Sequence, residues 1–245
     1  MKKFLFASTM LAVGAFAVAP AANAAPIVHD TVGEFSTITA NQGQATNLFG
    51  SAIVPVKPGR SAVADMFDNS LTTIYSLGLR VGGVGGTLEL TISPTTNFIT
   101  SGSVIELTNV VGGGLGQEER AFIYLGVDGG SYELVGEIFN NETPGGAGVA
   151  NAGNPNASLS FVALAGRNTT FALNVTSGVF NTLKLVDNSP FAPGVGGDTY
   201  LRDRDGFDIA ELEVTSNSVA VPEPATLALF GAGLLGLGLA RRRRA

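Results

Sequence analysis

Residues that could carry acid–base or nucleophilic chemistry are few in this chain. It has 1 histidine and 0 cysteines, which excludes a Cys–His pair and a histidine-rich zinc site. A Ser–His–Asp triad would depend on His29, which lies close to the N-terminus in a segment that we expect to be mobile. Paired carboxylates for glycoside hydrolysis stay open, because they are recognised by their separation in space. We therefore expect a protein that is not an enzyme.

One group of carboxylates lies close together near the end of the chain. The spacing Asp203-x-Asp205 is loosely that of a calcium loop, but the remaining ligand positions of an EF-hand are missing. We interpret the group as acidic side chains neutralised by neighbouring arginines. Its members are Asp198, Asp203, Asp205 and Asp208, interleaved with Arg202 and Arg204.

Rings that could stack on a sugar are scarce, with 15 Phe, 4 Tyr and 0 Trp. Indole is the usual stacking surface of a sugar cleft, so its absence argues against such a cleft. Phe98, Tyr124, Tyr132 and Tyr200 could offer stacking faces. We nevertheless predict that most of them belong to the hydrophobic core, where such rings usually lie in a sandwich.

The first residues have the three regions of a secretory signal peptide. Lys2 and Lys3 supply positive charge, and an apolar stretch runs over residues 4–18. Ala22-Asn23-Ala24 provides the small residues of a cleavage site, which predicts cleavage between Ala24 and Ala25. We therefore expect residues 1–24 to be removed and the remainder to be exported.

The last residues combine a Pro-Glu-Pro element, an uncharged apolar run and four arginines. The run covers residues 225–240. As a helix it would be roughly 24 Å long at about 1.5 Å per residue, short of the ~30 Å hydrocarbon core of a bilayer. It therefore predicts a marginal transmembrane span. The arginines that follow would hold that end in the cytoplasm by the positive-inside rule.

This order of signals resembles the PEP-CTERM sorting signal of Gram-negative bacteria that produce exopolysaccharide. The resemblance covers residues 221–245. The sorting motif comprises Val221, Pro222, Glu223 and Pro224, and the stop comprises Arg241, Arg242, Arg243 and Arg244. It implies transient anchoring at the inner membrane until an exosortase, a membrane cysteine peptidase, cuts near the motif. The alternative is a permanent single-pass anchor that is never cut.

Residues 25–220 form the predicted secreted domain. Setting aside Lys2, Lys3, the tail arginines and Glu223 from the 14 basic and 20 acidic residues leaves 8 and 19, a net charge near −11. Nucleic acid would repel such a domain, and cations would be attracted to it. It has no cysteine, so no disulfide can stabilise it in an oxidising compartment.

Short runs rich in Val, Ile, Thr, Leu and Phe fill this domain, and no long helical period occurs. Residues 87–93 alternate with period two, as a half-buried strand requires. Asp128-Gly129 predicts a hairpin with a type I′ turn. The pattern predicts a single all-β sandwich of jelly-roll type. Strands are expected at 34–39, 75–79, 87–93, 103–110, 121–127, 132–139, 158–165, 170–175, 179–186 and 207–214.

Two segments of the domain are similar to the discoidin, or galactose-binding-like, sandwiches. In residues 63–76, Asp68 and Thr73 take the Asp and Thr positions of the early Asp-Gly-Asx-x-x-Thr-x-Trp signature, and Tyr75 replaces the Trp. Asn69 and Ser70 depart from its Gly and Asx. Residues 205–214 resemble the closing strand, where an Ala-Glu-aliphatic-x-Val pattern ends the fold.

In many sandwiches of that kind the two segments meet and hold a structural calcium. The resemblance implies carboxylate ligands from Asp68 and Glu211, a hydroxyl from Thr73, and backbone carbonyls near Ser70 and Ala210. The alternative is that Asp68 caps its own loop and that Glu211 is an exposed strand residue.

Three functions remain from the sequence. The first is a non-catalytic protein of the cell surface or the exopolysaccharide matrix, of the kind found in biofilms. The second is a carbohydrate-binding module or adhesin on the same sandwich. The third, least favoured, is a secreted polysaccharide hydrolase.

Overall fold

The computed structural model describes residues 25–46, 53–56, 58–79, 85–93, 97–106, 119–140, 147–164, 169–189 and 206–218. The predicted signal peptide, the sorting tail, Tyr200 and Asp198, Arg202, Asp203, Arg204 and Asp205 lie outside these ranges. None of the helices within them is long and apolar enough to cross a membrane.

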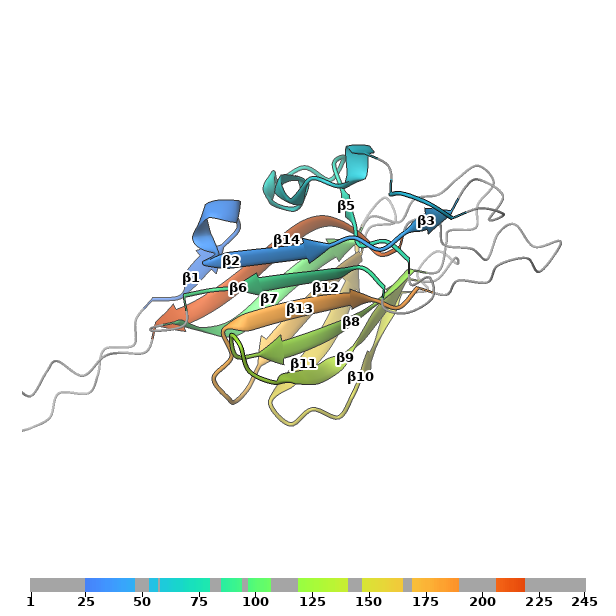
Figure 1. Ribbon diagram of the computed structural model, residues 1–245. Coiled ribbons are helices and arrows are strands. Elements are labelled where there is room, and N and C mark those ends of the chain that lie inside the picture. Colours follow the sequence, from blue (N-terminus) through green and yellow to red (C-terminus); the bar gives the residue numbers. More distant parts are fainter. Residues whose placement is uncertain are drawn as a thin grey trace, which may run out of the picture. The chain divides into compact units, whose positions relative to one another are not determined.

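Two antiparallel sheets make up most of the described chain (Figure 1). Sheet A has the order β1 (Ile27–His29), β14 (Asp208–Ser218), β7 (Asn97–Glu106), β12 (Thr169–Val175) and β11 (Ala157–Ala163), with β5 (Tyr75–Ser76) also paired to β14. Sheet B has the order β10 (Gly148–Asn151), β9 (Tyr132–Asn140), β8 (Glu119–Gly126), β13 (Thr182–Asp187), β6 (Thr87–Thr91) and β2 (Thr37–Asn41).

Smaller elements lie between these strands. Strands β3 (Ala45–Thr46) and β4 (Ile53–Val54) form a separate pair. Three short 3-10 helices are described, namely η1 (Val32–Glu34), η2 (Pro58–Arg60) and η3 (Val63–Phe67). Helix η3 packs against β14 and buries Met66 and Phe67.

The core lies between the two sheets because apolar residues alternate along the strands. In β8 the residues Ala121, Ile123 and Leu125 are buried, and in β13 Leu183 and Leu185 are buried. They belong to one hydrophobic cluster that also contains residues of β7, β12 and β14 from sheet A. The molecule is therefore a β-sandwich, and the predicted all-β sandwich is confirmed.

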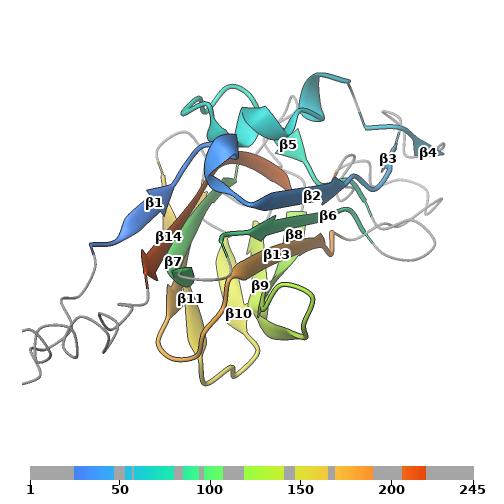
Figure 2. The same ribbon diagram turned by 60° about the vertical axis from the view of Figure 1, so that its left-hand side comes forward.

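The chain order of the strands follows the jelly-roll plan in part. β6 pairs with β13 and β7 pairs with β12, so early strands return beside late ones. β8 and β9 instead form a local hairpin within sheet B. Figure 2 shows β10 and β11, consecutive along the chain, beside each other although they belong to different sheets.

Most predicted strands are present with shifted ends, and the hairpin turn is of another type. Strand β7 begins at Asn97 rather than at residue 103, and β1 and β10 were not predicted. In the turn after β8, Gly130 N donates to Val127 O at 2.7 Å. Gly129 has a φ of 69°, whereas Asp128 does not have positive φ. A type I′ turn needs positive φ at both positions, so that prediction is wrong.

Buried carboxylates join the two sheets at one end of the sandwich. Asp187 of sheet B accepts a hydrogen bond from Phe207 N at 3.0 Å, and Glu119 accepts one from Asp208 N at 3.2 Å. Phe207 directly precedes β14, and Asp208 is the first residue of that strand. Their acceptors, Asp187 and Glu119, are 1% and 2% exposed. A third cross-sheet bond runs from Asn140 Nδ2 to Glu106 Oε2 at 2.8 Å.

Asp208 also holds the segment before β5 against sheet A. Its carboxylate lies 3.1 Å from an Arg60 guanidinium nitrogen and accepts a hydrogen bond from the Ser76 hydroxyl. The Gln42 side chain donates to the main-chain oxygens of Arg60 and Ser76, at 2.9 and 2.8 Å. Asp208 is thus paired with Arg60, whereas Arg202 and Arg204, the arginines predicted to neutralise the acidic group, lie outside the described residues.

The N-terminal strand β1 pairs with residues 214–216 near the end of β14 and is followed by η1. The Glu34 carboxylate accepts hydrogen bonds from the amides of Asp30 and Thr31, at 2.9 and 3.1 Å. These bonds favour its charged form and lower the pKa of Glu34, the amide of Asp30 having the largest effect. The bonds fix the turn that follows β1.

We predict that Glu34→Gln destabilises the protein at pH 7 and has no effect in acid. A carboxylate with a lowered folded-state pKa stabilises above its unfolded pKa, and that contribution disappears as the pH falls through the folded value. Urea unfolding of both proteins between pH 7 and pH 3 measures the difference. A difference that stays constant over this range would contradict the prediction.

We predict that Asp208→Ala lowers the free energy of unfolding by about 3 kcal/mol, because it removes the buried carboxylate that accepts from the partly buried Arg60 and from Ser76. Lys184→Met serves as the control, since it breaks an ion pair with Glu89 in the other sheet whose two side chains are each about one-quarter exposed, at 27% and 28%. It should cost less than about 1 kcal/mol. Denaturant unfolding measures both variants. An equal loss of unfolding free energy in the two would show that the buried network contributes no more to stability than the partly exposed pair does.

Candidate functional site

The single histidine is buried rather than mobile, so that prediction is wrong. His29 is 4% exposed and lies in β1, where pairing with β14 orders it. Its Nε2 lies 2.8 Å from the Ser216 hydroxyl, and its Nδ1 lies 3.2 Å from the main-chain oxygen of Glu34. A triad needs a carboxylate at Nδ1 and an accessible serine, whereas Ser216 is 0% exposed. The pair fastens β1 to β14.

Three of the predicted calcium ligands meet in the loop after η3. The Thr73 hydroxyl donates to Asp68 Oδ2 at 2.5 Å and lies 3.4 Å from the main-chain oxygen of Ser70. Asp68 Oδ1 accepts a hydrogen bond from Ser70 N at 2.9 Å. Asn69, the residue that replaces a glycine in the signature, has a φ of 56°. The loop thus gathers a carboxylate, a hydroxyl and a carbonyl while satisfying its own side chains.

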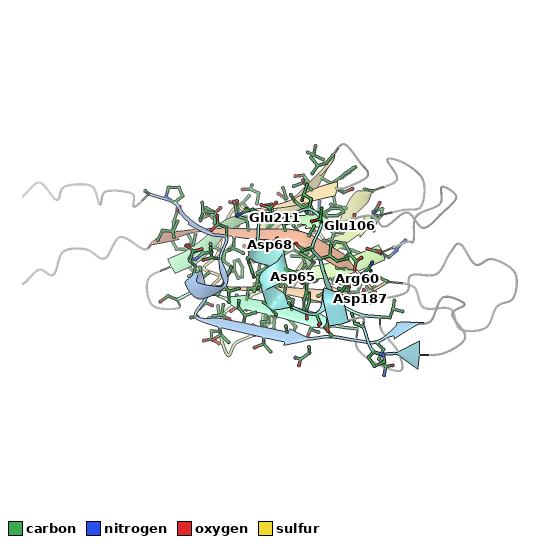
Figure 3. All side chains as sticks on the ribbon, turned by 90° about the horizontal axis from the view of Figure 1, so that it is seen from above. Arg60, Asp65, Asp68, Glu106, Asp187 and Glu211 are labelled. Atoms are coloured by element: carbon green, nitrogen blue, oxygen red, sulfur yellow. The ribbon has the colours of Figure 1, made fainter. Side chains whose placement is uncertain are left out.

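The other two predicted ligands lie on β14, the strand on which η3 packs. Ala210 is buried and Glu211 is partly buried, opposite Ile105 of β7. Figure 3 labels Asp68 on the loop after η3 and Glu211 on β14. No group of three or more His, Asp or Glu side chains suited to a metal ion is found in the described ranges. A site here would depend on hydroxyl and carbonyl oxygens in addition to its carboxylates.

The outward face of sheet B carries aromatic and charged side chains in alternation with the buried core residues. Phe122 and Tyr124 of β8 lie with ring centroids 6.3 Å apart at an interplanar angle of 70°. Arg120 of the same strand lies over the Phe139 ring, 5.3 Å from its centroid. All four side chains are partly exposed. Most of the rings Phe98, Tyr124, Tyr132 and Tyr200 were predicted to belong to the core, but the three that are described, Phe98, Tyr124 and Tyr132, are all partly exposed.

Both cations of this face have an acidic partner. Arg120 lies 3.4 Å from Glu137, which also accepts a 2.7 Å hydrogen bond from Asn188. Lys184 of β13 lies 3.6 Å from Glu89 of β6. The register places Lys184 directly between Tyr124 and Glu89 on the neighbouring strands. These four charges therefore cancel on a domain that is otherwise strongly acidic.

A hollow of about 290 Å³ opens on this face, and we call it the tyrosine hollow. Its lining residues come from the four neighbouring strands β9, β8, β13 and β6 in the middle of sheet B. Figure 2 shows these strands side by side. Its walls combine two phenol rings with one ammonium, one hydroxyl and one aliphatic side chain. They are Thr87, Tyr124, Tyr132, Lys184 and Val186.

Tyr132 is held in a fixed position in the hollow. Its ring lies so close to Gly126 that a Cβ at that position would meet Tyr132 Cδ1 at 2.7 Å. The Lys184 ammonium lies 4.6 Å from the centroid of the same ring. Burial, together with a hydrogen bond to Glu89, raises the pKa of the Tyr132 phenol above its ordinary value. The hydroxyl therefore stays protonated at physiological pH and is partnered by a carboxylate.

The residues that the sequence did not single out are Lys184 in this hollow, its ion-pair partner Glu89, and the buried carboxylates Glu106, Glu119 and Asp187. A signal for the carboxylates exists, since Glu119 shares the alternation of Ala121, Ile123 and Leu125. The same alternation places Lys184 outward, between Leu183 and Leu185. Which outward residues converge depends on the strand order, which the sequence does not contain.

Comparison with known proteins identifies the tail. The model of the PEP-CTERM protein-sorting motif matches residues 220–244, which confirms the predicted sorting motif. Such a motif marks a protein for export and exosortase processing. No curated protein sequence matches the chain.

Solved structures similar to the sandwich come from carbohydrate-binding modules and a chitobiase. The family 32 module of C. perfringens NanJ, in complex with galactose, has 14% identity and a TM-score of 0.36, over 78% of this chain and 93% of that one. The C-terminal domain of a Bacteroides fragilis chitobiase has 14% identity and a TM-score of 0.36, over 76% and 93%. A module of a C. perfringens family 31 glycoside hydrolase has 12% identity and a TM-score of 0.37, over 76% of this chain and 90% of that one.

Proposed function

We propose that this chain is an exported, non-catalytic protein of the cell surface or exopolysaccharide matrix of a Gram-negative bacterium. The observation that carries the proposal is the PEP-CTERM motif at residues 220–244. In this proposal the tail anchors the precursor transiently at the inner membrane. An exosortase then cuts it and releases the sandwich, whose extracellular partner is polysaccharide.

The described side chains support a binding role over a catalytic one. The only histidine is enclosed between Ser216 and a main-chain carbonyl, and so cannot take a proton from a substrate. The buried carboxylates Asp187 and Glu119 accept main-chain hydrogen bonds between the sheets, which is a structural task. A half-exposed aromatic face favours the second candidate, a carbohydrate-binding module, as a refinement of the same role.

We also propose a structural calcium ion between the loop at 68–73 and β14. Calcium takes six to eight oxygen ligands at about 2.3–2.6 Å. The donor set fits such an ion, because the Thr73 hydroxyl lies 2.5 Å from a carboxylate oxygen of Asp68 and 3.4 Å from the main-chain oxygen of Ser70. Glu211 would add a carboxylate and Ala210 a carbonyl. When bound, the ion would crosslink the early loop to the last strand in a protein without disulfides.

Processing of the tail is tested with the full chain, carrying an epitope after Arg244, in an exosortase-containing host. We predict that pulse–chase labelling separates the epitope from the exported sandwich. Replacing Pro222, Glu223 and Pro224 together by alanine should leave the epitope attached, whereas Pro155→Ala within the sandwich should not. Surface-exposed protein that still carries the epitope in the unaltered chain would indicate a permanent anchor instead.

Calcium binding is tested by thermal unfolding in calcium and in chelator. We predict that calcium at 100 times its Kd stabilises by about 2.7 kcal/mol, which is roughly 5–10 °C in Tm for a domain of this size. Asp68→Asn should abolish the shift, while Asp128→Asn in the exposed hairpin turn should retain it. An identical Tm in calcium and in chelator for the unaltered protein would remove the proposal.

A further inference from the structure

We propose that the tyrosine hollow on the outward face of sheet B binds a neutral glycan chain. This rests on the proposed function, in which extracellular polysaccharide is the partner, and it names the site and the class of sugar. The site would lie on the face of the sheet rather than in the loops at the ends of the strands. The walls of the hollow are described residues of four regular strands.

The walls of the hollow have the two kinds of surface that a pyranose needs. A sugar ring has faces made of C–H bonds and a rim of hydroxyl groups. Tyr124 and Val186 give the hollow an aromatic and aliphatic surface for such a face, beside the Tyr132 ring, which the Lys184 ammonium covers. Ligand sites are typically apolar with a few well-placed polar groups, and Lys184 and Thr87 supply those here.

The Lys184–Glu89 pair is suited to adjacent hydroxyl groups. The ammonium and the carboxylate lie 3.6 Å apart, each side chain being about one-quarter exposed, at 27% and 28%. The ammonium can donate to one hydroxyl while the carboxylate accepts from its neighbour, and both are charge-assisted hydrogen bonds. A vicinal diol therefore matches the pair, with no net charge required of the ligand.

Charge on the face selects a neutral ligand over an acidic one. Lys184 is paired with Glu89, and Arg120 is paired with Glu137. An anionic polymer would gain little from these neutralised cations, and the acidic remainder of the domain would repel it. A neutral chain meets neither penalty.

The face is also rigid and extended, as a polymer site requires. Gly126 allows the Tyr132 ring to lie close against β8, and the Lys184 ammonium covers the ring from β13. Beyond Tyr124, the rings of Phe122 and Phe139 continue the surface along β8 and β9. Rings held by strands lose little conformational entropy on binding. A chain of several sugars would therefore run from the hollow along β8.

The test is affinity gel electrophoresis of the full chain in mild detergent, with galactan, mannan, xylan, dextran or acidic alginate in the gel. We expect at least one neutral polymer to retard the protein. Tyr124→Ala and Tyr132→Ala should weaken that binding about tenfold or more, as loss of a central aromatic contact does. Tyr124→Phe should bind nearly as well as the unaltered protein, because it keeps the ring.

Phe161→Ala is the matched control, since Phe161 is a 40% exposed ring on β11 of the other sheet. It should leave the retardation unchanged, and melting curves should show each variant folded. Retardation by no neutral polymer, retardation by alginate alone, or equal weakening by Phe161→Ala and Tyr124→Ala would each overturn the proposal. None of these results bears on tail cleavage, which the epitope experiment measures separately.

Discussion

The structure depends on two hydrogen bonds between the sheets, in which buried carboxylates of sheet B accept from main-chain amides at the start of β14. Phe207 N and Asp208 N point to Asp187 and Glu119 across the sandwich, and Asp208 in turn binds Arg60 and Ser76. Buried charges are costly unless they are paired in this way. In a chain with 0 cysteines, this network takes the place of a disulfide in fixing β14.

The position of β14 decides where the other features lie. Its pairing with β1 brings the Ser216 hydroxyl within 2.8 Å of the His29 ring. Ala210 and Glu211 lie on the same strand, against which η3 packs. The alternation that turns Glu119 and Asp187 inward also turns Tyr124 and Lys184 outward on the same two strands, β8 and β13. One pattern of inward and outward residues thus builds both the cross-sheet network and the outer aromatic face.

The sequence predicted the fold class and most strands because alternation and turn residues are local signals. Residues 87–93 and 132–139 were placed nearly as β6 and β9 occur. The sorting tail could also be predicted from the sequence, since its three signals are consecutive. The strand β1 was missed because three residues carry no period, and only pairing with β14 orders them. His29 was expected to be mobile for the same reason.

The candidate binding site could not be predicted because it depends on which strands are neighbours. Residues 121–125 read Ala-Phe-Ile-Tyr-Leu, apolar on both faces, so nothing local tells which rings are buried. Tyr132 is far from Lys184 in the sequence, and they meet because β9, β8 and β13 are successive strands of sheet B. The loop for which we propose calcium is local by contrast, since Asp68, Ser70 and Thr73 lie within six residues of one another and are in contact.

In the proposed site the glycan meets the outward face of sheet B rather than an end of the sandwich. Titration of isotope-labelled protein with an oligosaccharide of a neutral polymer that retards it in the gel, followed by amide chemical shifts, tests this most directly. We expect the shifts to concentrate at residues 87–89, 122–126, 132 and 184–186. Shifts concentrated instead at the strand ends around Glu106, Asn140 and Asp187 would contradict it.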